Sequence, residues 1–109
     1  MEIPEVSSAV AKLSFVISQI RRCQHALNQQ GVRHVSVFGS VARGDAEPNS
    51  DIDAIIEPTP TASFTLFDLA RTREILESAL HCRVDVVTRQ TVDHSNFSEA
   101  PAREEIIAF

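Results

Sequence analysis

Apolar residues recur at helical spacing in two long stretches of the chain. In the first, from about residue 8 to residue 30, they form one stripe: Val10, Leu13, Ile17, Ile20 and Leu27. In the second, residues 64–81, the stripe is Leu66, Leu69, Ala70, Leu76 and Leu80. Residues three or four positions apart share one face of a helix, so both stretches predict long helices that cover a core. Ser7 or Ser8 can cap the first helix, and Gly31 can end it.

Short runs rich in β-branched residues alternate with these helices and predict strands. They cover residues 35–38, 51–56 and 83–88. Between the first two runs, residues 41–43 predict one helical turn that ends at Gly44. The turn-forming residues 45–50 (DAEPNS) then predict a loop.

The last part of the chain gives a weaker pattern. After Arg89 only residues 99–108 favour regular structure, a short helix that carries Ile106 and Ile107. The alternation of strands and helices predicts an α/β (α+β) fold, with a small mixed sheet of three to four strands covered by helices on one face. The order of the strands is left open.

Composition narrows the class of protein. The 109 residues, of which 43% are hydrophobic, suffice for one core, so we expect a single domain over residues 1–109. The net charge of -5 argues against general nucleic-acid binding, but not against a nucleotide substrate. No apolar run approaches the roughly 18 residues of a membrane span, and the first residues lack the basic region of a signal peptide. We therefore expect a cytoplasmic protein without membrane contact, with Cys23 and Cys82 as small core residues.

Two aspartates, Asp51 and Asp53, stand two positions apart on the second predicted strand. Their side chains should point to the same face, with Cα atoms roughly 6.5–7 Å apart, while Ile52 and Ala54 point into the core. Two carboxylates on one face repel each other unless a positive charge lies between them, and hard oxygen ligands suit Mg²⁺. A solvent-facing strand end is the alternative, because the DxD pattern alone is common.

A third acid, Asp85, interrupts the apolar run of the last predicted strand. If that strand neighbours the first pair, three carboxylates converge and can hold two metal ions roughly 3.5–4 Å apart, as in phosphoryl transfer. An edge-strand residue that faces solvent is the alternative reading of Asp85.

The turn after the first predicted strand offers an anion site. Gly39 permits a tight turn and a close approach of a ligand to the backbone. Ser40 offers a hydroxyl beside the free N–H groups of the following helical turn, although it can also be only a helix cap. Arg43 lies one turn further on and can reach either a phosphate or the acidic loop.

Together these residues resemble the signature of the minimal nucleotidyltransferase family, which belongs to the DNA polymerase β-like superfamily. The string Gly39-Ser-Val-Ala-Arg-Gly-Asp45, followed by Ser50-Asp-Ile-Asp53, is similar to the family's GSxARG…SDxD pattern, with ten residues between Ser40 and Asp51. Asp85 lies after an intervening helix, where the family's third acid is expected. The resemblance covers the motif core, residues 35–88, and leaves residues 89–109 as a C-terminal tail. It implies the polymerase β-like nucleotidyltransferase fold.

The resemblance also implies an activity, the transfer of an NMP, with AMP from ATP as the expected case, to a hydroxyl group. The catalytic residues and metal ligands would be Asp51, Asp53 and Asp85, holding two Mg²⁺ ions or Mn²⁺ in their place. Asp85 would also help to activate the acceptor. The nucleotide would be bound by Gly39, Ser40, Arg43 and Ser50.

A protein partner follows from the same resemblance. Small members of the family are often encoded beside a helical HEPN protein, as antitoxin to its toxin, and a Tyr hydroxyl of that partner is the acceptor. A single small domain also leaves little chain for an acceptor pocket. Candidate docking residues are Phe97, Ile106, Ile107 and Phe109, although core packing is an equal alternative for the two isoleucines. A non-catalytic antitoxin that retains the fold, and a plain acidic domain with incidental aspartates, remain as alternatives.

Overall fold

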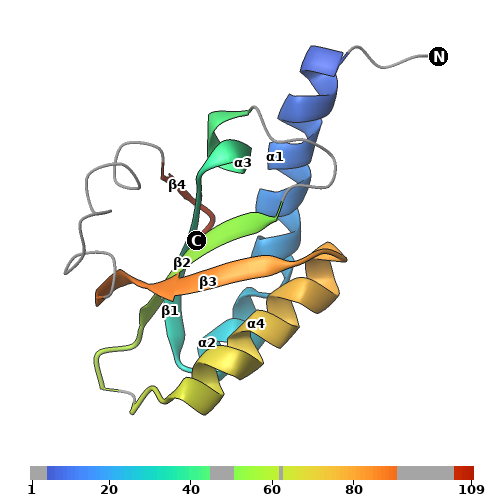
Figure 1. Ribbon diagram of the computed structural model, residues 1–109. Coiled ribbons are helices and arrows are strands. Elements are labelled where there is room, and N and C mark those ends of the chain that lie inside the picture. The colour runs from blue at the N-terminus through green and yellow to red at the C-terminus, as the bar shows by residue number, and fades with distance from the viewer. Residues whose placement is uncertain (1–4, 45–50, 62, 91–104) are drawn as a thin grey trace.

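A mixed sheet forms the centre of the computed structural model, which describes residues 5–44, 51–61, 63–90 and 105–109 (Figure 1). Its strand order is β3-β2-β1-β4. The strands are β1 (Val32–Phe38), β2 (Ile52–Pro58), β3 (Val84–Thr88) and β4 (Ile106–Ile107). The helices are α1 (Glu5–Arg22), α2 (Gln24–Gln29), α3 (Ser40–Arg43) and α4 (Leu66–Leu80). β1 is antiparallel to β2 and β4, whereas β2 and β3 are parallel, so the predicted small mixed sheet is confirmed.

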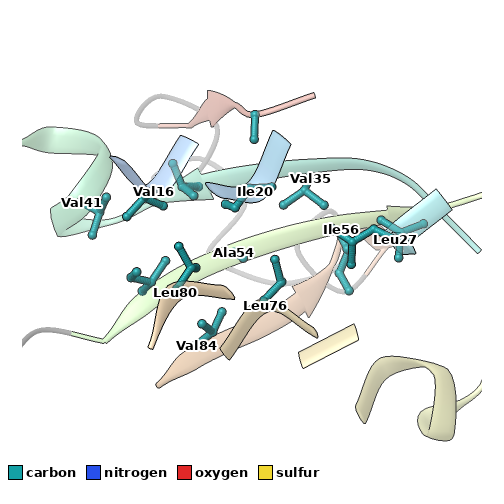
Figure 2. Packing of buried hydrophobic residues seen from close by; sticks show 14 residues of the cluster. Val16, Ile20, Leu27, Val35, Val41, Ala54, Ile56, Leu76, Leu80 and Val84 are labelled. Atoms are coloured by element: carbon teal, nitrogen blue, oxygen red, sulfur yellow. The ribbon is translucent and has the colours of Figure 1, made fainter. Parts of the chain in front are cut away.

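The core lies between one face of this sheet and the helices (Figure 2). The strands contribute Val35, Ala54, Ile56 and Val84, and the helices contribute Val16, Ile20, Leu27, Val41, Leu76 and Leu80. Alternate residues of a strand point to opposite faces. Because Ile52, Ala54 and Ile56 face the core, the odd-numbered residues of this segment face away from it, on the side that none of the described helices covers.

The first helical stretch is not the single helix that the apolar stripe predicts. It breaks at Cys23, whose N–H donates to the carbonyl of Ile20, three residues back, at 3.0 Å. Ile20 of α1 and Leu27 of α2 are both fully buried under the sheet. The start is also earlier than predicted, since α1 begins at Glu5 and Ser7 lies inside it rather than at its cap.

The C-terminal residues form an edge strand, so the helix predicted over residues 99–108 is wrong for its described part. Ile106 and Ile107 pair with β1, and the backbone of Val35 also bonds to Ala108. The outer edge of β1 offers unpaired backbone groups, and a β-branched pair suits a strand better than a helix end. Arg21 donates its Nε–H to the carbonyl of Ala108 at 2.8 Å, which attaches this segment to α1.

Helix α4 presents only part of its predicted apolar stripe to the core. Leu76 and Leu80 are buried, but Leu66 is 82% exposed and its neighbour Phe67 is 87% exposed, because the first turn lies outside the buried cluster. A capping box fixes this end of the helix: Thr65 and Asp68 exchange side-chain and backbone hydrogen bonds. The exposed apolar turn is therefore held in a defined conformation.

The two cysteines are half-buried and pack against the core, as predicted. Burial raises the pKa of both thiols above its ordinary value, which keeps them protonated and unreactive. Within the described ranges, none of the helices combines the length and the apolarity needed to cross a membrane.

Candidate active site

The sheet brings two of the three predicted acids side by side. Asp53 on β2 lies opposite Asp85 in the parallel register of β2 and β3, and opposite Phe38 on its other side. Asp51 precedes the first residue of β2, two positions before Asp53. Asp53 and Asp85 thus lie on the sheet face that the described helices leave uncovered, and the pairing of β2 with β3 resolves the strand order that the sequence left open.

Asp53 is the central acid of the group. Partial burial raises its pKa above the ordinary value, and the negative charges of Asp85 and Asp51 raise it further. The positive charge of Arg43 acts in the opposite direction and lowers the pKa of Asp53. Asp53 thus interacts with both other acids and with the cation of α3 at once.

Gly39 sets the shape of the turn beside this acid. Its φ of 74° lies in the left-handed region, and a Cβ at this position would come 2.7 Å from Oδ2 of Asp53. Only glycine fits both the backbone conformation and the space. The turn therefore passes directly against the Asp53 carboxylate.

Helix α3 continues from this turn and is held by the core. Val41 is buried, and Gly44 ends the helix in the left-handed conformation, as predicted. Gly39, not Ser40, occupies the capping position, and it makes no side-chain bond there. The alternative reading of Ser40 as a helix cap is therefore wrong. Ser40 is instead the first helical residue, where backbone N–H groups lack partners within the helix.

Several predicted residues stand apart from this group or cannot be placed. Ser50 and Phe97 lie outside the described residues. Ile106 and Phe109 are half-buried and pack against the core, whereas Ile107 is 65% exposed on β4. Of the predicted docking residues in the described ranges, Ile107 is the most accessible.

The donor set suits Mg²⁺ bound together with a nucleotide. Within the described ranges, no three acidic, imidazole or thiol side chains form a ready-made metal cage. Mg²⁺ seldom uses such a cage: it is usually held by one or two carboxylates together with substrate phosphates. All three side chains offer hard oxygen ligands, and their repulsion at Asp53 is the kind that a cation relieves. The residues present therefore fit a magnesium–nucleotide complex.

An ion pair on the same sheet face was not predicted from the sequence. Arg89, just after β3, forms a two-contact ion pair with Glu105, just before β4, and one contact is 2.9 Å long. Glu105 also accepts a hydrogen bond from Ser36, two residues before Phe38 on β1. These bonds lower the pKa of Glu105. In the sequence, this ion pair is indicated only by an arginine, Arg89, at the start of the tail and a glutamate, Glu105, near its end.

Comparison with known proteins agrees with this geometry. Residues 17–108 match the family model of the nucleotidyltransferase domain. The protein adenylyltransferase MntA of Thermococcus cleftensis is 37% identical over 62 residues, which cover 57% of this chain and 61% of the relative. The matched region thus spans less than two thirds of that relative's length.

Two solved structures share the fold. A candidate minimal nucleotidyltransferase is 33% identical with a TM-score of 0.62, and the match covers 83% of this chain and 93% of that one. A toxin–antitoxin structure with AMP-PNP has a TM-score of 0.64 over 85% of this chain and 72% of that one. At 18% identity this second likeness concerns the fold alone.

Proposed function

The chain belongs to the nucleotidyltransferase domain family, and we propose that it transfers AMP from magnesium–ATP to a protein hydroxyl, a tyrosine of a HEPN-type toxin. The similarity to a named protein adenylyltransferase supports AMP as the transferred group and a protein as its acceptor. The toxin–antitoxin structure of the same fold, with its ATP analogue, supports a toxin as the partner. The protein would act as an antitoxin.

The observation that carries the proposal is the register of Asp53 and Asp85. The two carboxylates meet on adjacent parallel strands, with Asp51 beside them and the Gly39 turn against Asp53. Burial and the neighbouring negative charges raise the pKa of Asp53, a cost that has no structural benefit of its own. This arrangement supports the proposal of a nucleotidyl-transfer site.

In the proposed reaction the oxygen of the acceptor hydroxyl forms a bond to the α-phosphorus of ATP. The bond from that phosphorus to the bridging oxygen breaks, pyrophosphate leaves, and the hydroxyl proton passes to a carboxylate, for which Asp85 is the candidate. Mg²⁺, two ions in the expected case, would supply charge neutralisation and alignment when bound by Asp51, Asp53 and Asp85.

The turn after β1 is the proposed phosphate site. The first backbone N–H groups of α3, at Gly39 and Ser40, would donate to the β- and γ-phosphates. Arg43, already close enough to lower the pKa of Asp53, would add positive charge beside them. Ser50 stays a proposed nucleotide-binding residue on the basis of the sequence motif.

The exposure of Asp85 supports a macromolecular acceptor. Asp85 lies on β3, at one edge of the described sheet, and is exposed. A small acceptor needs surrounding walls, whereas a protein surface brings binding energy from contacts remote from the reacting hydroxyl. An open edge therefore favours docking of a partner.

The decisive experiment is incubation with candidate HEPN-type partner proteins, using each of the four NTPs with Mg²⁺. We expect the partner's intact mass to increase by one AMP with ATP, peptide mapping to locate it on a Tyr, and Asp53→Asn to abolish the increase. A stable complex without any mass increase would instead favour the non-catalytic antitoxin. Modification of free sugars or aminoglycosides, with an unmodified partner, would contradict the proposal.

A further inference from the structure

A groove lies between the first half of α4 and the outer edge of β3. Its volume is about 450 Å³, and it is lined by Leu66, Leu69, Ala70 and Arg73 of α4 and by residues 84–87 of β3. Asp85 belongs both to this lining and to the acidic site formed with Asp51 and Asp53. Any molecule that fills the groove therefore lies against a proposed catalytic residue.

One wall of the groove is an edge strand. β3 pairs with β2 on one side, and in the described part of the chain no strand pairs with its other side. An edge strand presents backbone N–H and C=O groups to which a further strand can bind. The sequence of β3, VDVVT, contains neither the proline nor the lysine that often prevent such pairing.

The other wall is apolar and accessible. Leu66 is 82% exposed although it belongs to a well-capped helix, and Leu69 is half-buried beside it. Because α4 covers the core face of the sheet, a strand added to β3 would place every second side chain over these leucines. The remaining side chains would point to the carboxylate face, beside Asp85.

The charges at the groove favour a basic occupant. Its lining cation, Arg73, already pairs with Glu77 at 3.4 Å. The part of the groove that borders the acidic site carries Asp85 and, next to it, Asp53 and Asp51. A bound triphosphate adds about as much negative charge as two divalent cations remove, so this part stays negative during the reaction.

We propose that the groove binds an extended segment of the acceptor protein as an additional strand along β3. In this arrangement the residue that carries the acceptor hydroxyl lies opposite Asp85. Neighbouring strands are about 4.8 Å apart, so this position brings its side chain close to the Asp85 carboxylate. The residues immediately before and after it are apolar and pack against Leu66 and Leu69. The next residues on either side share the face of the acidic site and are Lys or Arg. The proposal takes its chemistry from the proposed function, but the binding it describes is measurable without nucleotide.

The probe is a short fluorescent peptide with a central Tyr, a Leu on each side of it and Arg at the next positions. We expect this peptide to bind the full chain and to slow backbone hydrogen exchange at β3. Leu66→Gln should weaken binding about tenfold, the expected loss for one apolar anchor. Phe15→Gln changes an apolar side chain that is 51% exposed on α1, outside the groove, and should leave binding unchanged.

Peptides methylated on alternate backbone nitrogens test strand pairing itself. Methylation of the amides that face β3 should abolish binding, whereas methylation of the other set should not, because an added strand pairs along one edge. Absence of peptide binding, equal loss with both methylated sets, or an unchanged affinity in Leu66→Gln would overturn the proposal.

The same variants separate this inference from the proposed function. If peptide binds in the groove but neither peptide nor partner protein receives AMP, the groove stands and the proposed transfer fails. If the partner protein is modified at an equal rate by the wild type and by Leu66→Gln, the transfer stands and the groove proposal fails.

Discussion

A Cβ on Gly39 would come within 2.7 Å of the Oδ2 atom of Asp53, so the turn after β1 and the central acid of the site occupy adjoining space. Real Cβ atoms essentially never approach a heavy atom so closely. The turn is anchored through Val41 in the core, and Asp53 through the register of β2. Neither can move freely, so a change at position 39 must disturb the carboxylate.

Gly39→Ala should therefore impair both stability and catalysis, and Gly44→Ala is its matched control. Both glycines have positive φ, 74° and 81°, but their ψ angles differ. Gly44, with ψ of 17°, lies in the left-handed helical region, where alanine costs roughly 1–2 kcal/mol. Gly39, with ψ of -148°, lies in a region essentially restricted to glycine, where the strain is roughly 1–3 kcal/mol. Only the first meets Asp53, since a Cβ at residue 44 has no atom of the described residues within 4 Å. We expect both variants to lower the melting temperature, Gly39→Ala more strongly, and a loss of at least about tenfold in kcat/KM for Gly39→Ala alone. Equal activity of the two variants would contradict this account of the turn.

Asp53→Asn should raise the melting temperature of the metal-free protein at pH 7. The pKa of Asp53 is raised in the folded state by burial and by Asp85 and Asp51, so the folded chain holds this proton more tightly than the unfolded chain. Stability therefore falls as pH rises from the ordinary Asp pKa to the raised one, and the full penalty is present at neutral pH. Asparagine removes that charge, and it should also reduce the stabilisation by Mn²⁺ with ATP.

Asp68→Asn is the control for this measurement, because the pKa of Asp68 is lowered by its hydrogen bonds to Thr65. Its replacement should decrease the melting temperature at pH 7. A decrease in both variants would show that Asp53 is not under repulsion in the free protein.

Loss of either flanking acid should abolish transfer while the fold persists. If Asp51 and Asp85 both act at the α-phosphate, Asp51→Ala and Asp85→Ala should each lose at least about a hundredfold in kcat. Ser40→Ala should lose less, since the backbone N–H groups of α3 remain. Single-turnover rates with purified partner, together with melting curves, measure this. Wild-type rates in Asp51→Ala would remove Asp51 from the site.

Glu105→Gln should destabilise the protein in a pH-dependent manner. Hydrogen bonds from Arg89 and Ser36 lower the pKa of Glu105, so its contribution is present above the ordinary Glu pKa and disappears as pH falls through the lowered value. We expect a loss of about 1–2 kcal/mol at pH 7 that shrinks toward pH 3 in denaturant titrations. Glu57→Gln, which breaks an exposed contact of 4.0 Å with Arg33, should change stability little at either pH. A constant difference across this range would show that the Glu105 charge is not involved.

The local sequence alone determined which segments form the site. The β-branched runs, the turn at Gly39 and the stop at Gly44 depend on the conformational preferences of single residues, and the structure confirms each of them. The chain could not by itself show that residues 106–107 pair with β1, because strand pairing depends on partners far away in sequence. Taken alone, the sequence of residues 106–107 is equally compatible with the end of a helix.

What only the tertiary structure decided is how these segments meet. The alternation around Asp51 and Asp53 predicted one common face, since side chains of a strand alternate whatever surrounds it. The sequence left open whether Asp85 would join them, and the parallel register of β2 and β3 settled it by placing Asp85 opposite Asp53. The exposure of Leu66 was equally inaccessible, because helical periodicity reports which residues share a face, not how far the core extends along the helix.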